Sequence, residues 1–400
     1  MESLLETILI VDDQEINLKL LEKVMRSQGY CTHVARDGRQ AVASARRLLP
    51  DLILLDIVMP EFDGFQVCTE LRASAQTGHI PIIFLSAKNK PEDIARGLEL
   101  GGSDYVAKPF NKLEILARVK THLSLHRKNR DLETAGKMLR ARQDRIAEDL
   151  LAAASIQQSL LPKQNPDLDF GRLDWAFLPC EQVAGDIFNF FPLDETHWAM
   201  YIIDVCGHGV PSAMIAVSVS QVLNPLTGLL TKDTTCPAPP DPIVSPGAVM
   251  AELNRLFPFD RFQKFFTISY VICHLPSGQI RYSSAGHPPP VVLRARGGCE
   301  TLSEGGPLIG FDQPLPHPEG RTVLGSGDRL FLYTDGLYEH QGASGDRFGM
   351  GRLLDILAAR RDLPLAENVS GTIESVKAFG NGTAPSDDIS ILGFEYLGVP

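Results

Sequence analysis

Short apolar runs alternate with amphipathic stretches between residues 7 and 126 of this chain. The runs that we expect to form buried strands are residues 8–11, 31–35, 52–55, 82–85 and 105–107. Strands that alternate with helices in this way are typical of a parallel sheet flanked by helices. The first part of the chain is therefore predicted to be an α/β domain.

Polar residues follow four of these runs directly. Asp12 and Asp13 follow the first run, Asp56 the third, Ser86 the fourth and Lys108 the fifth. Because the binding sites of open α/β sheets lie at the carboxyl ends of the strands, we expect these side chains to lie close together. A carboxylate that attacks an anionic phosphorus needs a metal to offset repulsion and a cation to hold the product. The pattern indicates phosphoryl transfer to a carboxylate.

Residues 111–161 contain few helix breakers and many charged residues, which predicts one long helix. Apolar residues recur at every seventh position: Leu125, Leu132, Leu139, Ile146, Ala153 and Leu160. The positions four residues further on are mainly polar, so the stripe favours a parallel coiled coil and a homodimer but leaves a solvated spacer helix open. Gly136 lowers helix stability by about 0.5–1 kcal/mol relative to Ala. Such a marginal helix suits a switch between arrangements of similar energy.

Carboxylates also mark the ends of strand-like runs in the last 220 or so residues. Residues 199–203 lead into Asp204 and residues 330–334 into Asp335, and the chain adds Asp186 and Asp387. Ionised carboxylates that converge repel one another unless cations neutralise them. Oxygen ligands suit Mg²⁺ or Mn²⁺ rather than zinc. Paired hard cations make hydroxide from water and clamp a phosphate, so this part of the chain indicates phosphate-ester hydrolysis.

Composition narrows the class of protein. A chain of 400 residues is too long for one ordinary core, and the net charge of −11 gives no basic surface for nucleic acid or anionic lipid. No helix-turn-helix segment follows the α/β domain. Seven cysteines without a Cys-x-x-Cys pair indicate free thiols, and we expect Cys206 to be a small buried residue rather than a nucleophile. With no signal peptide or membrane-length apolar run, we expect a soluble cytoplasmic protein.

The first domain resembles the receiver domain of two-component response regulators over residues 7–126. Besides the polar residues at the strand ends, the residues that carry the resemblance are Met59, Pro60, Asp63, Gly64, Pro109 and Phe110. The resemblance implies a flavodoxin-like fold in which Asp56 accepts a phosphoryl group from a histidine kinase or a phosphotransfer protein.

The same resemblance assigns roles around Asp56. It implies an Mg²⁺ site with four ligands: Asp12, Asp13, Asp56 and the backbone carbonyl of Val58. Ser86 would bond a phosphoryl oxygen, Lys108 would pair with its charge, and Tyr105 would be the aromatic residue that turns inward.

The second domain resembles the metal-dependent serine/threonine phosphatases of the 2C type (PPM family), in their bacterial sporulation and stress-response branch. The matching motifs, in chain order, are residues 156–162, 183–186, 204–209, 284–288, 333–336 and 387–389. The resemblance implies an α+β sandwich of two antiparallel sheets flanked by helices. Residues 224–246 and 297–318 are expected to be loops, the first either contributing to substrate recognition or forming a disordered insertion.

The resemblance to the phosphatases also implies a di-metal site of two Mn²⁺ or Mg²⁺ ions. Asp204 would bridge both ions, Asp186 and the Val205 carbonyl would hold one, and Asp335 and Asp387 the other. We prefer Asp387 to its neighbour Asp388, because Asp387 takes the ligand position of the family.

Two assignments in this domain stay open. His208 or His287 would protonate the leaving seryl oxygen, or both only orient loops. Asn189 stands where the family usually has Asp; it keeps an oxygen acceptor without the charge, and its effect on a metal stays open.

The sequence thus predicts a receiver at residues 1–126, a helical linker at 127–162 and a phosphatase domain at 163–400. The predicted enzyme is a metal-dependent protein-serine/threonine phosphatase controlled by phosphorylation of Asp56. Its expected substrate is a phosphoprotein of the anti-sigma-factor antagonist class, and neither nucleic acid nor membrane is an expected partner. The alternative is a non-catalytic adaptor built on a phosphatase-like module. The sign of regulation, the preferred metal and the identities of kinase and substrate stay open.

Overall fold

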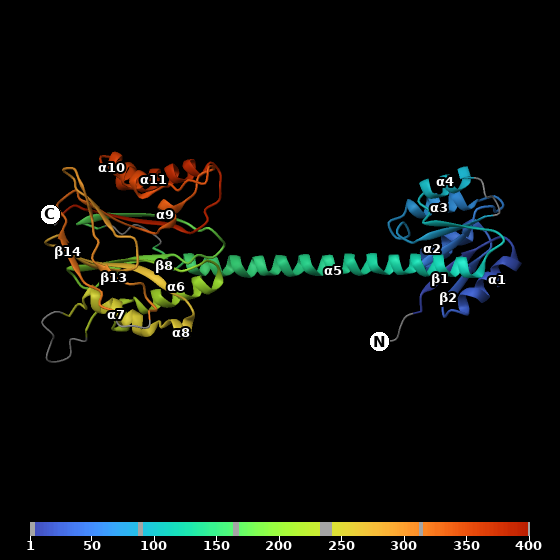
Figure 1. Ribbon diagram of the computed structural model, residues 1–400, viewed down its shortest axis with the longest axis horizontal. Helices are drawn as coiled ribbons and strands as arrows, with labels where there is room; N and C mark the ends of the chain where they lie inside the picture. The colour runs from blue at the N-terminus through green and yellow to red at the C-terminus, as the bar shows by residue number, and fades with distance from the viewer. Residues whose placement is uncertain (1–4, 87–90, 163–167, 233–241, 312–314, 399–400) are drawn as a thin grey trace. The chain divides into compact units, whose positions relative to one another are not determined.

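The computed structural model describes residues 5–86, 91–162, 168–232, 242–311 and 315–398 (Figure 1). The chain forms two compact units that divide between Gln143 and Asp144. This division falls inside the predicted linker, and the domain limits given above stay a prediction. Part of the expected loop at 224–246, residues 233–241, lies outside the described residues.

The first unit is built on a five-stranded parallel sheet with the strand order β2-β1-β3-β4-β5. The strands are β1 (Thr7–Val11), β2 (Cys31–Ala35), β3 (Leu52–Asp56), β4 (Ile82–Ser86) and β5 (Asp104–Ala107). Strands β3 and β4 are buried along their whole length, which is why they appear in the sequence as unbroken apolar runs. The predicted flavodoxin-like receiver fold is confirmed.

Helices cover both faces of this sheet. Helix α1 (Glu15–Arg26) and the first part of α5 (Lys112–Gln158) pack on one face. Helices α2 (Gly38–Leu48) and α3 (Gly64–Arg72) pack on the other, and α4 (Pro91–Glu99) precedes β5. Helix α3 begins beside β3, where a Cβ atom on Gly64 would lie 2.2 Å from the carbonyl oxygen of Asp56. Only glycine fits there, and this close approach positions the end of β3.

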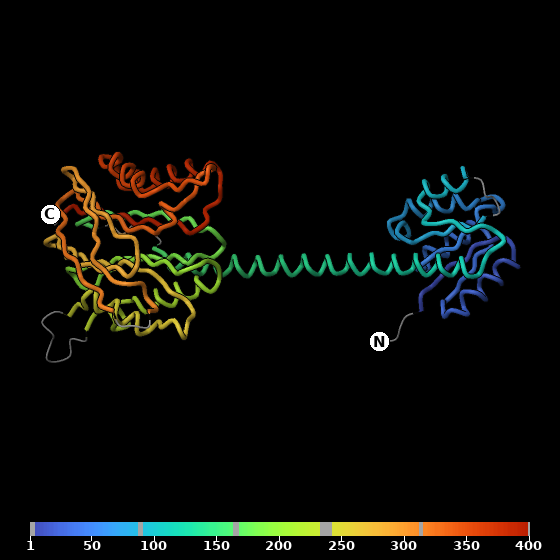
Figure 2. The backbone as a smooth tube through the Cα atoms, in the orientation of Figure 1, coloured from blue at the N-terminus to red at the C-terminus, as the bar shows by residue number. Residues whose placement is uncertain are grey.

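Helix α5 (Lys112–Gln158) runs without a break through the predicted linker (Figure 2). Four apolar side chains at its seven-residue spacing are exposed: Leu125 (51%), Leu132 (71%), Leu139 (59%) and Ile146 (59%). The predicted helix is present. A paired helix stays a prediction, and the exposed stripe is the surface on which a coiled coil would form.

The second unit contains two sheets. One has the order β13-β10-β9-β8-β7, with β14 also paired to β10, and the other has the order β12-β11-β15-β16-β6. All pairings are antiparallel except β10 with β13. The strands are β6 (Gly171–Leu178), β7 (Ile187–Pro192), β8 (His197–Val205), β9 (Phe266–His274), β10 (Gln279–Ala285), β11 (Val291–Leu293), β12 (Cys299–Thr301), β13 (Gly305–Gly306), β14 (Gly320–Val323), β15 (Arg329–Tyr333) and β16 (Ile389–Tyr396).

The two sheets pack face to face, and helices cover their outer faces (Figure 1). Helices α6 (Val210–Val222) and α7 (Pro246–Leu256) contact β7, β8, β9 and β10. The short helices η1 (Pro225–Thr227) and α8 (Phe259–Phe262) flank α7 in the chain. Helices α9 (Gly336–Glu339), α10 (Met350–Ala359) and α11 (Leu365–Gly380) cover the second sheet. The predicted α+β sandwich is confirmed.

One part of the second unit differs from the sequence-based expectation. Residues 297–318 were expected to be a loop, but they contain β12 and β13, which are too short to give a strand pattern in the sequence.

Among the residues that the structure describes, no helix is both long enough and apolar enough to cross a membrane.

Candidate functional site

The first site lies at the carboxyl ends of β1, β3 and β5. Oxygen atoms of Asp12, Asp13 and Asp56 lie within 4.8 Å of one another. Asp12 and Asp56 are buried, whereas Asp13 is exposed. The Lys108 ammonium donates to the Oδ2 atoms of Asp12 and Asp56, both at 2.7 Å. The structure therefore brings together the carboxylates and the cation that the strand pattern placed at one edge.

Burial and neighbouring charges act in opposite directions on the pKa values of Asp56 and Lys108. Burial raises the pKa of Asp56 despite the nearby Lys108. Burial alone would lower the pKa of Lys108, but its bonds to Asp12 and Asp56 outweigh burial and raise it. Lys108 thus stays charged beside the carboxylate that we predict to accept a phosphoryl group, where it would neutralise part of the product's charge.

Three further predicted residues surround Asp56. Val58 is exposed, and its N–H donates to Asp56 Oδ1 at 3.3 Å. Ser86 is fully buried at the end of β4, and the Tyr105 hydroxyl donates to its carbonyl oxygen at 3.5 Å. Asn17, which the sequence analysis missed, donates to Asp12 Oδ1 at 3.0 Å. Its position on the first turn of α1, five residues after Asp12, is the sequence feature that could have identified it as a neighbour of Asp12.

The second site lies between the two sheets of the second unit, at one end of four strands. Asp186 immediately precedes β7, and Asp204 is the penultimate residue of β8. Asp335 follows β15 by two residues, and Asp387 precedes β16 by two. Antiparallel pairing sets the end of β8 beside the start of β7, and the end of β15 beside the start of β16. Each sheet therefore contributes two of the predicted carboxylates.

The carboxylates of this second site raise one another's pKa. Burial raises the pKa of Asp204 to about 7, and the charges of Asp335 and Asp387 add to the shift. Burial and the charge of Asp204 raise the pKa of Asp186 well above its usual value. Burial and neighbouring carboxylates likewise raise the pKa values of Asp335 and Asp387. These shifts indicate repulsion among the four groups, whose role as a metal site stays a prediction. The described side chains of this unit with ligand atoms within 4.8 Å of one another are Cys180, Asp387 and Asp388.

Asp388 differs from its neighbour Asp387. Asp388 is buried, and its Oδ1 accepts from the N–H of Cys180 at 2.8 Å while its Oδ2 accepts from the N–H of Gly185 at 2.6 Å. Asp387 is exposed, and its Oδ1 accepts from the N–H of Asp388 at 2.8 Å. Both oxygens of Asp388 thus fix the loop before Asp186, and this geometry supports Asp387 as the ligand.

Helix α5 reaches the same loop through Gln157. This side chain is buried: its Nε2 donates to the Ala184 carbonyl at 2.7 Å, and its Oε1 accepts from the Ala184 N–H at 3.0 Å. Ala184 lies two residues before Asp186. Gln157 lies within the motif at residues 156–162, but the sequence alone indicates no role for it, because its partner is 27 residues away.

The two candidate histidines have different environments. His287 is buried, with Nδ1 2.8 Å from the Thr267 hydroxyl and Nε2 3.1 Å from the Tyr333 carbonyl oxygen. Burial lowers the pKa of His287 to about 3, which supports a neutral, orienting residue. His208 is exposed and lies 2.7 Å from Glu181 Oε1.

Asn189 lies away from the carboxylates. Phe188 contacts Phe177 of the other sheet across the interior, with ring centroids 6.4 Å apart. Successive residues of a strand point to opposite faces of the sheet. Asn189 therefore lies on the face covered by α6, next to Tyr201, its register partner on β8. The missing charge at residue 189 is therefore outside the four-carboxylate cluster.

Lys264 and Cys206 border the loop that follows Asp204. The Lys264 ammonium donates to the Cys206 carbonyl at 2.9 Å and to the Ser212 hydroxyl at 3.1 Å. The expectation that Cys206 is buried was wrong: the residue as a whole is exposed, in the loop where Gly207 has a φ of +82°. Burial of the thiol group and the charge of Asp204 raise the pKa of Cys206, as expected for a poor nucleophile.

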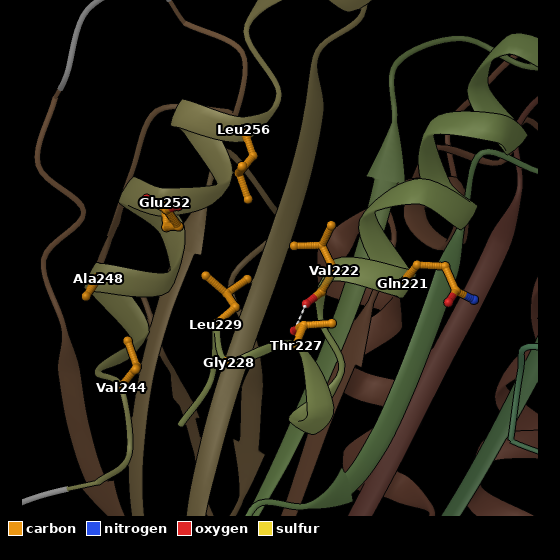
Figure 3. A pocket seen from close by; sticks show the side chains of 9 residues that line it. All are labelled: Gln221, Val222, Thr227, Gly228, Leu229, Val244, Ala248, Glu252 and Leu256. Carbon is orange, nitrogen blue, oxygen red and sulfur yellow. Dashed lines mark hydrogen bonds between the residues drawn. The ribbon is translucent and has the colours of Figure 1, made fainter. Parts of the chain in front are cut away.

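A hollow of about 500 Å³ lies in the helical layer, between the end of α6 and α7 (Figure 3). The Thr227 hydroxyl, at its edge, donates to the Val222 carbonyl at 2.7 Å. The lining residues are Gln221, Val222, Thr227, Gly228, Leu229, Val244, Ala248, Glu252 and Leu256. None of the predicted carboxylates lines this hollow, so it is separate from the candidate active site.

The residues of the second site fit hard divalent cations. They offer carboxylate oxygens from four strand ends, and their pKa values are raised because the negative charges are buried together. Cations would relieve this repulsion, and oxygen ligands match the preference of Mg²⁺ and Mn²⁺. The three carboxylates of the receiver site fit one Mg²⁺ ion for the same reason.

Two family models match the chain. The one described as Stage II sporulation protein E (SpoIIE) matches residues 194–396, and the one described as response regulator receiver domain matches residues 8–120. The first match covers just over half of the chain. It begins after Asp186, so the place of Asp186 in the site rests on the geometry described above.

Curated relatives match about a third of the chain. The DNA-binding response regulator MtrA of Mycolicibacterium smegmatis is 42% identical over 131 residues, which are 33% of this chain and 55% of MtrA. The response regulator PleD of Caulobacter vibrioides is 44% identical over 114 residues, 28% of this chain and 25% of PleD. The chain spans about half the length of MtrA and a quarter of PleD, so the activities of those whole proteins are not carried over to it.

Among solved structures, the SiaA-PP2C domain of Pseudomonas aeruginosa matches 64% of this chain and 98% of its own length, with a TM-score of 0.55 and 19% identity. At this identity the likeness shows the fold alone. It agrees with the two packed sheets and their helical layers.

The raised pKa of Asp204 predicts a pH-dependent stability of the metal-free protein. The folded chain holds this proton up to about pH 7 and the unfolded chain only to about pH 4, so stability falls as pH rises between these values. With chelator at pH 7.5, Asp204→Asn should raise the free energy of unfolding by on the order of 1–3 kcal/mol, and this gain should vanish near pH 4. Chemical denaturation at both pH values measures it. Asp131→Asn, on the exposed surface of α5, is the control, and an equal gain at both pH values would contradict the prediction.

Proposed function

The chain belongs to the Stage II sporulation protein E (SpoIIE) family and carries a response regulator receiver domain, and on that basis we propose that it is a phosphorylation-controlled, metal-dependent protein-serine/threonine phosphatase. The observation that carries this proposal is the placement of four carboxylates at the ends of paired strands in two facing sheets: Asp186, Asp204, Asp335 and Asp387. A non-catalytic adaptor would not need to retain four carboxylates that repel one another, three of them buried or half-buried.

In the proposed mechanism the carboxylates hold two Mn²⁺ or Mg²⁺ ions. Asp204 would be a ligand of both ions, Asp186 and the Val205 carbonyl would hold one, and Asp335 and Asp387 would hold the other. Two such cations activate water for in-line attack on a phosphate ester without a covalent enzyme intermediate. His208 is the better placed histidine to protonate the leaving oxygen, because it is exposed and its charge acts on Asp387.

The proposed substrate is phosphoserine or phosphothreonine on a protein of the anti-sigma-factor antagonist class. Membership of the SpoIIE family supports this class, and the net charge of −11 makes nucleic acid an unsuitable partner.

Hydrolysis of a chromogenic phosphate ester tests the catalytic part of the proposal. Activity should require Mn²⁺ or Mg²⁺ and disappear with chelator, and Asp204→Ala should reduce kcat/KM by at least about a hundredfold because it removes the bridging ligand. Asp194→Ala should retain activity. Wild-type protein that binds Mn²⁺ without hydrolysing any phosphoprotein or ester would favour the adaptor.

The receiver is proposed to accept a phosphoryl group on Asp56 from a histidine kinase or a phosphotransfer protein. Mg²⁺ would be held by four ligands: Asp12, Asp13, Asp56 and the Val58 carbonyl. Lys108 already bonds Asp56 and would hold the phosphoryl charge, with Ser86 bonding one of its oxygens. Tyr105 already bonds the backbone of Ser86, so it is placed to respond to a change at that strand end.

Substitution of the phosphoacceptor tests this control. Asp56→Ala should abolish the change in phosphatase activity produced by a small phosphodonor such as acetyl phosphate, while activity without phosphodonor stays within about twofold of wild type. Asp131→Ala, an exposed carboxylate on α5, is the control. A full response of Asp56→Ala to the phosphodonor would refute Asp56 as the phosphoacceptor.

Helix α5 is proposed to carry the signal, as a coiled coil in a homodimer. Its apolar stripe is exposed, and its last turn contacts the loop of Asp186 through Gln157. A shift or rotation of α5 would therefore change the backbone two residues from a proposed metal ligand.

Gln157 and its neighbour Gln158 provide a matched test. Gln157→Leu removes both hydrogen bonds to Ala184 and should raise the Mn²⁺ concentration for half-maximal activity by about tenfold, with a smaller response to phosphodonor. Gln158 is exposed, and Gln158→Leu should behave as wild type. Identical Mn²⁺ curves for the two variants would remove Gln157 from the coupling.

A further inference from the structure

The two carboxylate oxygens of Asp186 have different environments. The Thr334 hydroxyl donates to Oδ2 at 2.8 Å, and the Ser390 hydroxyl donates to the same atom at 2.5 Å. All three residues are buried. Because a carboxylate oxygen has two lone pairs, these two bonds engage Oδ2 fully and leave Oδ1 to other partners.

The direction of this network is fixed by the backbone. The Ser390 N–H donates to the Thr334 Oγ1 at 3.1 Å, so the Thr334 hydroxyl directs its own hydrogen to another acceptor. Asp186 Oδ2, at 2.8 Å, is nearer than the Asp388 carbonyl oxygen, at 3.4 Å. Thr334 and Ser390 lie opposite each other where β15 and β16 pair, and the Thr334 N–H donates to the Ser390 carbonyl at 3.1 Å. The bond from the Thr334 N–H to the Ser390 carbonyl joins the two residues without their hydroxyl groups, whereas the Ser390 N–H uses the Thr334 Oγ1 as its acceptor. Ser390→Ala therefore removes a bond to Asp186 and leaves both of these bonds in place.

We propose that Thr334 and Ser390 are positioning residues that set the metal specificity of the phosphatase site. By engaging Oδ2 from the opposite sheet, they restrict Asp186 to a single ligand oxygen, Oδ1. This inference rests on the proposed function, because it concerns the ions that Asp186 would bind there.

A single ligand oxygen favours small cations over Ca²⁺. Mg²⁺ requires near-octahedral coordination by six oxygens, and Mn²⁺ prefers the same oxygen ligands, whereas Ca²⁺ takes six to eight oxygens and often binds both oxygens of a carboxylate. With Oδ2 engaged, Asp186 cannot offer the second oxygen that a larger ion would use. The hydroxyl pair therefore discriminates against Ca²⁺ without contacting the ion.

The double variant Thr334→Val/Ser390→Ala tests this specificity by calorimetric titration of the full chain with MnCl₂ and with CaCl₂. All proteins carry Asp13→Ala, which removes a ligand of the receiver site. Mn²⁺ affinity should fall by about 10–100-fold, as for other groups that orient metal ligands. Ca²⁺ affinity should fall less or rise, so that the ratio of Mn²⁺ to Ca²⁺ affinity drops at least tenfold. Thr334→Ser keeps the hydroxyl group and should keep the wild-type ratio.

The control is Ser269→Ala, which breaks a buried hydroxyl pair with Ser284 at 2.6 Å that does not involve Asp186. This variant should leave the ratio unchanged, and thermal unfolding with chelator checks the fold of each protein. Equal losses of Mn²⁺ and Ca²⁺ affinity in the double variant, or an unchanged ratio, would overturn the inference. Wild-type protein that binds no Mn²⁺ at this site would instead overturn the proposed function.

Discussion

The repulsion among the carboxylates at four strand ends is the constraint on which the second unit depends. Asp186, Asp204, Asp335 and Asp387 come from four strand ends, and burial and mutual charge raise their pKa values. The surrounding groups hold them together: Asp388 fixes the preceding loop through two backbone N–H groups, and Gln157 fixes Ala184. An arrangement that costs folding free energy without cations persists because neighbouring hydrogen bonds over-determine it.

The two units stabilise their clustered carboxylates with different kinds of partner. In the receiver, Lys108 bonds Asp12 and Asp56 directly, so a protein cation offsets part of the negative charge. In the phosphatase unit the neighbours of Asp186 Oδ2 are neutral hydroxyl groups, which stabilise the anion without neutralising it. The first arrangement suits a site whose charge changes when a phosphoryl group arrives, and the second suits a permanent ion site.

Much of the fold was predictable because buried strands leave unbroken apolar runs, and the carboxylates were predictable because they terminate those runs. The bonds of Asp186 to Thr334 and Ser390 join residues that are 148 and 204 positions apart in the sequence. No local sequence pattern predicts such bonds. The separate roles of Asp387 and Asp388 depend on which one faces the loop of Gly185. The place of Asn189, by contrast, follows from strand alternation, since it lies three residues after Asp186.

The order of the strands has a consequence for synthesis. The receiver sheet is complete by Ala107, whereas the phosphatase cluster needs Asp387 and the anchoring of β16, which ends at Tyr396. Under the proposed function, a nascent or truncated chain that stops before β16 would keep a complete receiver sheet but lack the strand that anchors Asp387. Such a product would compete with the intact chain for the proposed kinase, so the last strand would decide whether a translated chain passes the signal on.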